Sequence, residues 1–263
     1  MVMSSDPGSP RTTVLHDPAL FRRLESSYNL LPLSSRDGFF VDLVLDIIGS
    51  CARPRTVVDI GCGRGIGTDP ALLRGVRAAC ETLIGVEPDP SVEQASGTFD
   101  AIHCATFEDC AIPDASVDVA YSCMVMEHVV DPEAFMDRLY RALRPGGSYI
   151  FMTVNGAHYF ARIANALRRA GLDEHVLRAV RGSGAVDGYH YPTAYRFNDP
   201  ATIARLCERT GMCQPRFVFA EHDGAKCYFP GPSKAAWHAL TLKRRLIRRK
   251  ESLLQLIGLI TRP

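Results

Sequence analysis

The stretch that decides the fold is Val57-Val58-Asp59-Ile60-Gly61-Cys62-Gly63-Arg64-Gly65. Its apolar residues suit a buried parallel strand, because branched side chains fill both faces of a strand that is covered on both sides. The three alternating glycines that follow lack Cβ atoms, so the backbone can turn sharply and approach a ligand closely. Open α/β sheets bind ligands outside the carboxyl ends of their strands, so the sequence predicts a binding loop here.

The spacing of these glycines separates two ligand classes. A dinucleotide-binding fingerprint needs glycines at its first, third and sixth positions. Counted from Gly61 the sixth position is Ile66, and counted from Gly63 it is Thr68. Both counts fail, which disfavours a pyrophosphate cradle. Asp59, at the end of the strand, can instead accept hydrogen bonds from a cationic or hydroxyl-bearing ligand.

A second carboxylate follows a second short apolar segment. Glu87 and Pro88 come directly after residues 83–86, which read Leu-Ile-Gly-Val. In a βαβ unit this strand lies beside the first one, so we expect Glu87 over the same crevice. The two oxygens of its carboxylate match the two hydroxyls of an adenosyl ribose.

Two further motifs complete a family pattern. The tripeptide Glu127-His128-Val129 precedes a helix that Asp131 can cap and Pro132 can begin, and the helix ends at Leu143-Arg144-Pro145-Gly146-Gly147. With these motifs, residues 55–155 resemble class I S-adenosylmethionine-dependent methyltransferases. These motifs resemble those of the methyltransferase type 11-like branch, which acts on small molecules such as ubiquinone precursors and sugars.

The resemblance implies an α/β fold with a doubly wound, Rossmann-like sheet of seven strands. The implied strand order is 3-2-1-4-5-7-6, with the last strand antiparallel, an N-terminal helical layer and a substrate-side insertion. Residues 217–220 and 227–229 are expected to form the closing antiparallel pair of strands.

The resemblance also implies S-adenosylmethionine as methyl donor and S-adenosylhomocysteine as product. It assigns to the cofactor Asp59, Gly61, Cys62, Gly63, Gly65, Glu87, Pro88, Thr106, Phe107, Ser122 and Met124. Thr106 stands where family members often carry an aspartate that accepts a hydrogen bond from the adenine amino group. A threonine hydroxyl can accept that bond, and Phe107 can instead contact adenine through its backbone and ring.

Methyl transfer to a hydroxyl requires a group that accepts a proton. His128 is the first candidate base, because it follows the strand that borders the cofactor and imidazole takes a proton near neutral pH. His190, His158 and Tyr195 are further candidates. Two alternatives stay open: His128 can simply hold a helix start in place, and aligned binding can suffice without a dedicated base.

Composition sets the remaining limits. The chain has 263 residues, 46% of them hydrophobic, and a net charge of only +1, which gives no global field for nucleic acid. Nine scattered cysteines without a Cys-x-x-Cys pair suit reduced thiols in a cytoplasmic protein and predict no metal site. No signal region or membrane-spanning stretch is expected.

Four segments are expected along the chain. Residues 1–13 are predicted to be disordered, and residues 14–233 to form the methyltransferase domain. Within it, residues 14–50 are a helical flank or lid, residues 51–155 the cofactor half and residues 156–199 a substrate insertion. Residues 234–263 are predicted to be a basic amphipathic helix, whose apolar stripe consists of Leu242, Leu246, Leu253, Ile257 and Ile260.

The charge of this last segment allows two interpretations. Residues 234–262 carry eight Lys or Arg and one Glu. One interpretation is a helix at residues 240–260 that contacts the inner membrane surface peripherally. The other is a helix that packs on the domain or on a second subunit, and the oligomeric state stays open.

The predicted function is methyl transfer to a small-molecule acceptor, most simply a hydroxyl of a sugar, a lipid-linked intermediate or a secondary metabolite. Two alternatives come from other classes. One is a non-catalytic module that binds S-adenosylmethionine or a protein partner, and the other is a nucleotide-dependent oxidoreductase, which the glycine spacing disfavours.

Overall fold

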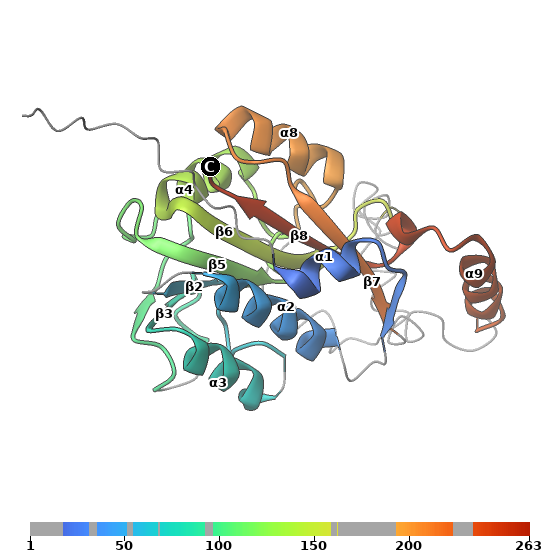
Figure 1. Cartoon of the computed structure of the whole chain (residues 1–263), viewed down its shortest axis with the longest axis horizontal. Coiled ribbons are helices and arrows are strands. Elements are labelled where there is room, and N and C mark those ends of the chain that lie inside the picture. Colours follow the sequence, from blue (N-terminus) through green and yellow to red (C-terminus); the bar gives the residue numbers. More distant parts are fainter. Residues whose placement is uncertain are drawn as a thin grey trace, which may run out of the picture.

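A single twisted sheet organises the computed structural model, which describes residues 18–31, 36–51, 55–67, 69–92, 97–158, 162, 193–222 and 234–263. Its eight strands lie in the order β1-β7-β8-β6-β5-β2-β3-β4 (Figure 1). The strands are β1 (Asn29–Leu31), β2 (Thr56–Ile60), β3 (Thr82–Val86), β4 (Ala101–His103), β5 (Val117–Cys123), β6 (Leu143–Val154), β7 (Arg216–His222) and β8 (Gln255–Thr261). From β4 to β7 this is the predicted order, so the fold class is confirmed.

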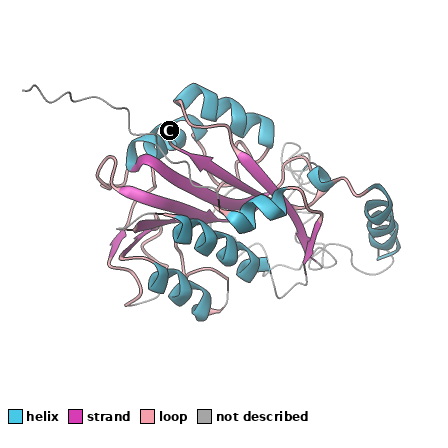
Figure 2. Ribbon diagram, in the orientation of Figure 1, coloured by secondary structure: helices cyan, strands magenta, loops and turns pink. Residues whose placement is uncertain are grey.

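Helices cover both faces of the sheet (Figure 2). One layer holds α1 (Ala19–Glu25), α2 (Arg36–Ser50) and α3 (Pro70–Ala79), and the other holds α4 (Pro132–Ala142) and α8 (Pro200–Thr210). Each layer buries its own apolar cluster. Phe40, Ile47 and Leu73 pack on the first face, and Phe135 and Leu206 on the second. Burial of both faces explains why the central strands are almost continuously apolar.

The local signals for the second layer are confirmed. Asp131 accepts hydrogen bonds from the backbone N–H groups of residues 133 and 134, and Pro132 is the first residue of α4. Asp199 accepts from Thr202 N at the start of α8, and Gly211 ends that helix in the left-handed region with a φ of 76°. These caps fix where each helix begins relative to the sheet edge.

The predicted C-terminal helix is wrong beyond residue 247. The helix α9 (Lys234–Ile247) ends before Arg248, whose φ is +47°, and a short 3-10 turn, η4 (Lys250–Ser252), follows. Residues 255–261 then form β8, which is antiparallel to β6 and β7 and lies between them. Leu256, Ile257 and Ile260 are therefore sheet core, and the methyltransferase domain does not end at residue 233.

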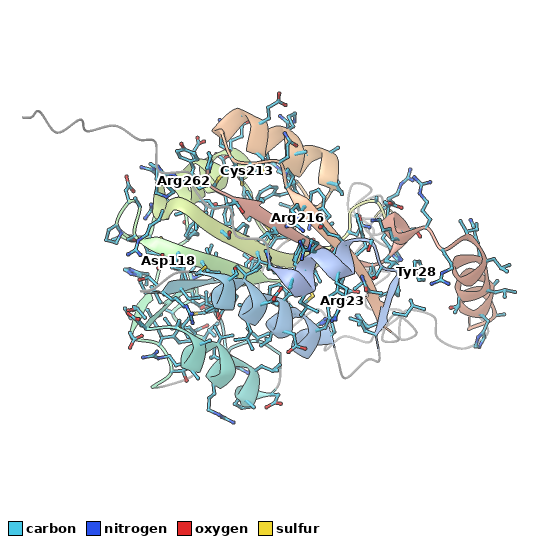
Figure 3. The ribbon with its side chains drawn as sticks, in the orientation of Figure 1. Arg23, Tyr28, Asp118, Cys213, Arg216 and Arg262 are labelled. Atoms are coloured by element: carbon cyan, nitrogen blue, oxygen red, sulfur yellow. The ribbon has the colours of Figure 1, made fainter. Side chains whose placement is uncertain are left out.

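The N-terminal segment differs from the prediction in one element. Residues 29–31, expected in a loop, form the edge strand β1, which pairs in parallel with β7. The helix α1 is tied to β7, because Arg216, which is labelled in Figure 3, pairs with Glu25 and lies over the Phe21 ring. The predicted disorder of residues 1–13 and the predicted strand at residues 227–229 lie outside the described residues.

Candidate functional site

The glycine loop leaves the carboxyl end of β2 in a conformation that favours glycine. Gly61, Gly63 and Gly65 have φ values of 69°, 46° and 102°. A Cβ atom on Gly63 would meet no protein atom closer than 3.8 Å, so the space beside this residue faces away from the packed core. The loop therefore leaves room for a ligand at the point where the sequence predicts one.

Glu87 joins this loop to the end of β3. Its carboxylate is only 4% exposed, and its Oε2 atom accepts a hydrogen bond of 2.9 Å from Gly63 N. Its Oε1 atom accepts a bond of 3.1 Å from Asp89 N, just beyond Pro88. The structure thus brings the two predicted carboxyl-end elements together through one buried acid.

Asp59 is the second buried acid at this edge. The Tyr121 hydroxyl of β5 donates a 2.8 Å hydrogen bond to its Oδ2 atom. Burial raises the pKa of Asp59 to about 7, the Tyr121 bond opposes that rise, and the nearby charge of Glu87 adds to it. The neighbouring Cys62 thiol is buried over Gly85, and burial raises its pKa to about 12, as suits a packing residue.

The start of α2 also belongs to this edge, which the sequence did not predict. A Cβ atom on Gly67 would lie 2.4 Å from Asp37 Oδ2, and the φ of Gly67 is +64°. Arg36 donates a 2.7 Å hydrogen bond from its Nε atom to Asp37 Oδ1. The close approach shows that the glycine loop and the first turn of α2 fit each other, although no motif in the sequence marks the contact.

The assigned residues after β4 and within β5 have mixed surroundings. Thr106 is exposed and its hydroxyl donates to Asp109 Oδ2 at 2.9 Å. The Phe107 ring is buried against Phe135, with 5.1 Å between ring centroids, so the ring lies in the core. Ser122 is fully buried and shares a 2.6 Å hydrogen bond with the hydroxyl of Tyr149. Side-chain contacts of Phe107 and Ser122 with a cofactor are therefore not what this geometry favours.

The end of β5 leads into a sharp turn. Met124 has a φ of +58°, and its N–H donates to Met152 O at 2.7 Å. His128 follows, half-buried, with its backbone N–H donated to Val125 O at 2.8 Å. The turn therefore places His128 at the same carboxyl edge as the glycine loop.

A buried polar chain lies beside this turn and was missed by sequence reasoning. Glu127, 4% exposed, accepts a 2.7 Å hydrogen bond from Thr153, which in turn accepts a 2.6 Å bond from Asn198 Nδ2. Burial raises the pKa of Glu127, while the Thr153 bond and the charges of His128 and Arg36 lower it. Glu127 stood in a recognised motif, but only the fold shows that its side chain points inward.

The other candidate bases have different surroundings. His158 is buried, with its Nε2 atom 3.8 Å from Glu221 Oε2, at the junction of β6 and β7. Tyr195 has a φ of +50°, and its N–H donates to Glu127 O at 3.0 Å. His190 and most of the predicted insertion at residues 156–199 lie outside the described residues.

Comparisons with known proteins agree with this geometry. Residues 33–212 match the family model described as a methyltransferase domain. The chain therefore belongs to the methyltransferase family. Its domain is of the class I, S-adenosylmethionine-dependent kind, as the strand order and the glycine loop also indicate.

Individual relatives are more distant. A ubiquinone biosynthesis O-methyltransferase of Nitrobacter winogradskyi is 30% identical over 172 residues, which are 62% of this chain and 58% of that protein. An uncharacterized methyltransferase of Mycobacterium avium is 38% identical over 104 residues, covering 38% of this chain and 39% of the relative. The matches thus span about two fifths to three fifths of these relatives' length.

A solved structure shows the same fold over nearly the whole chain. An S-adenosylmethionine-dependent methyltransferase of Archaeoglobus fulgidus has a TM-score of 0.53 at 14% sequence identity. The alignment covers 93% of this chain and 98% of that structure. The described part of the chain contains no group of three or more His, Cys, Asp or Glu side chains that could hold a metal ion. In the same part, every helix is too short or too polar to cross a bilayer.

Proposed function

We propose that this protein transfers a methyl group from S-adenosylmethionine to a hydroxyl of a small-molecule acceptor. The observation that carries the proposal is the hydrogen bond between Gly63 and Glu87, which joins the two cofactor elements at one sheet edge. The family match supports the donor, and the name of the Nitrobacter relative supports an oxygen acceptor. Acceptors of this chemistry include sugars, lipid-linked intermediates and secondary metabolites.

The donor's ribose is assigned to Glu87. Each of its carboxylate oxygens already accepts one backbone N–H, from Gly63 and from Asp89. An ionised carboxylate has about four acceptor sites, so it can accept bonds from hydroxyl groups as well as from backbone N–H groups. The existing bonds orient the carboxylate before the ligand arrives.

The donor's methionine portion is assigned to the glycine loop and Asp59, and its adenine to the segment after β4. Gly61, Cys62, Gly63 and Gly65 would contribute backbone groups, since the Cys62 side chain packs on Gly85. Thr106 would offer its exposed hydroxyl to adenine, and Phe107, Ser122 and Met124 would contribute through the backbone. Arg138 braces this segment, donating from its buried guanidinium to the carbonyl of Cys110 at 3.1 Å.

The bound donor supplies a methyl group that its sulfonium already activates. The protein must align the acceptor, exclude water and take up a proton. We assign the proton to His128, and to Glu127 the stabilisation of the protonated imidazole, because the two charges interact. Asn198 and Thr153 hold the Glu127 carboxylate in place.

Two measurements test the function. Calorimetry should show binding of S-adenosylhomocysteine and no binding of NAD, because the glycine spacing does not fit a pyrophosphate. Donor with a labelled methyl group should transfer label to a small-molecule acceptor. Label on no acceptor of any class, despite tight cofactor binding, would favour the non-catalytic module.

We also place the protein in the cytoplasm, because all eight cysteines in the described residues are free thiols.

A further inference from the structure

The connection between β7 and β8 is far longer than the pairing of these strands requires. The two strands are antiparallel neighbours, with Ala220 opposite Gln255, and antiparallel neighbours can be joined by two to five residues. Here residues 223–254 lie between them and include α9. The connection leaves and re-enters at the carboxyl edge of the parallel strands, which is the edge that carries the glycine loop.

The helix α9 stands apart from the sheet (Figure 1). The chain that returns from it is anchored at its base, because Lys250 Nζ donates to Glu25 O at 2.6 Å and Arg248 lies 5.6 Å from the Tyr28 ring centroid. Tyr28 lies at the end of the molecule nearest α9, opposite Asp118 at the amino edge of the sheet (Figure 3). The helix therefore projects from the ligand-binding edge.

The projecting helix exposes an apolar stripe. Ala235, Ala239, Leu242 and Leu246 follow each other at steps of four, three and four residues, which places them on one helical face. All four are exposed, and Leu242 and Leu246 are 59% and 77% exposed. Ile247, beside the stripe, is 59% exposed.

The charge of α9 and the residues directly after it indicates which kind of surface the helix contacts. Residues 234–250 contain seven Lys or Arg and no Asp or Glu. An apolar stripe flanked by cations alone suits an anionic lipid surface, where the stripe enters the acyl boundary and the cations meet headgroups. A second copy would bring like charges together, and the cores of protein interfaces are depleted of charge.

We propose that α9 docks the protein on an anionic membrane surface, with the ligand-binding edge of the sheet facing the bilayer. The docking itself does not depend on the chemistry at the site. Resting on the proposed function, it narrows the acceptor to a lipid-linked hydroxyl within reach of that edge.

The test uses the full chain, because a chain that ends at residue 233 would lack β8. The protein is sedimented with vesicles of equal parts phosphatidylglycerol and phosphatidylcholine at low salt, and with pure phosphatidylcholine vesicles. We expect binding to the first vesicles only, and its loss as salt rises. The double variant Leu242→Ser/Leu246→Ser and the variant Lys243→Glu should each weaken binding by roughly tenfold or more.

Two control variants make the same kinds of substitution on other parts of the surface, one at an apolar side chain and one at a charged side chain. Ile102→Ser changes a side chain that is 37% exposed on β4, at the end of the sheet opposite β1, and Arg74→Glu reverses an exposed charge on α3. Both should bind the anionic vesicles like the wild type.

Three outcomes overturn the proposal. The first is a full-length protein that ignores anionic vesicles at low salt, and the second is binding that the α9 variants leave unchanged. The third is a concentration-dependent dimer, seen by light scattering, that the α9 variants abolish while vesicle binding persists. Unchanged affinity for S-adenosylhomocysteine in every variant excludes misfolding as the cause of weaker vesicle binding. A wild-type protein that binds the vesicles but transfers no methyl group would reject the proposed function alone.

Discussion

Glu87 holds the backbone N–H groups of two neighbouring loops, so its replacement affects the ligand and the loops together. We expect Glu87→Ala to weaken S-adenosylhomocysteine binding by about 1.5–3 kcal/mol for each charge-assisted hydrogen bond that is lost. Glu87→Gln, which retains one acceptor oxygen, should lose less. Calorimetry measures both, with Glu81→Ala at the opposite end of β3 as control. Unchanged affinity in folded Glu87→Ala would reject the ribose assignment.

A substitution at Gly63 tests whether the glycine loop contacts the cofactor, provided that the effect of backbone strain is measured separately. Valine at this φ of +46° costs about 1–2 kcal/mol of backbone strain. Since no protein atom blocks its Cβ within 3.8 Å, the larger effect of Gly63→Val should be loss of cofactor binding. Gly97→Val imposes similar strain at a φ of +76° with no neighbour within 4 Å, and should bind cofactor normally. Equal affinity in the two variants would show that the loop does not line the site.

Asp59 makes stability depend on pH in a direction opposite to that of an ordinary ion-paired acid. Its folded pKa of about 7 exceeds the usual value of 3.8, so the folded state binds the proton more tightly. This stability is present at low pH and is lost as pH rises from about 4 to about 7. The full change is roughly 4 kcal/mol at about 1.36 kcal/mol per pK unit.

The variant Asp59→Asn tests this sign, because it removes the charge and keeps an acceptor for Tyr121. Relative to the wild type, its free energy of unfolding should rise between about pH 4 and pH 7. Urea titrations at several pH values measure the difference between the two proteins. A difference that stays constant over this range would mean that the Asp59 carboxyl is ionised throughout.

At the residue scale, the sequence predicts correctly that two acids stand at the carboxyl ends of neighbouring strands. The roles of Asp59 and Glu87 as acids at strand ends follow from short apolar runs, and both lie where the fold requires. The contact of Asp37 with Gly67 and the inward direction of Glu127 depend on packing between distant segments. Such contacts leave no spacing or composition by which a single sequence reveals them.

At the scale of elements, β8 shows why one pattern can mislead. Leu253, Ile257 and Ile260 recur at helical spacing, but residues 253–260 are also an almost continuous apolar run. Such a run fits a strand between two others, and all of these residues are buried. The helix α9 ends at Ile247 without a glycine or proline, so no local signal marks the change.

The pairing of β6 with β8 can be tested at this scale. Gly258 lies opposite Phe151, and a Cβ atom there would lie 2.2 Å from the ring. We expect Gly258→Ala to lower the free energy of unfolding by about 1–3 kcal/mol through overpacking. In α3, Gly75 has no neighbour within 4 Å, and Gly75→Ala should raise stability by about 0.5–1 kcal/mol. Urea unfolding of both variants gives the comparison, and two effects of the same sign would contradict the sheet register.

At the scale of the molecule, the order of the central strands is the most predictable feature of the sheet. The order from β4 to β7 follows the family resemblance, because each βαβ crossover places the next strand predictably. The features that the sequence did not predict are β1 at one end of the sheet and the long connection between β7 and β8. Both lie on the β7 side of the sheet, several strands away from β2 and its glycine loop.

Cofactor binding should therefore stabilise the molecule as a whole while protecting only one edge. A ligand at about 100 times its Kd adds roughly 2.7 kcal/mol to the free energy of unfolding, so S-adenosylhomocysteine should raise Tm by several degrees and NAD should not. Hydrogen exchange should slow in residues 61–67, 87–90 and 104–107, and in the first turn of α2, because Asp37 touches Gly67. The helix α9 should exchange equally fast with and without ligand. Protection of α9 together with an unprotected glycine loop would reject the glycine loop as the cofactor site. An equal rise of Tm with NAD would reject an S-adenosyl ligand as the specific ligand class.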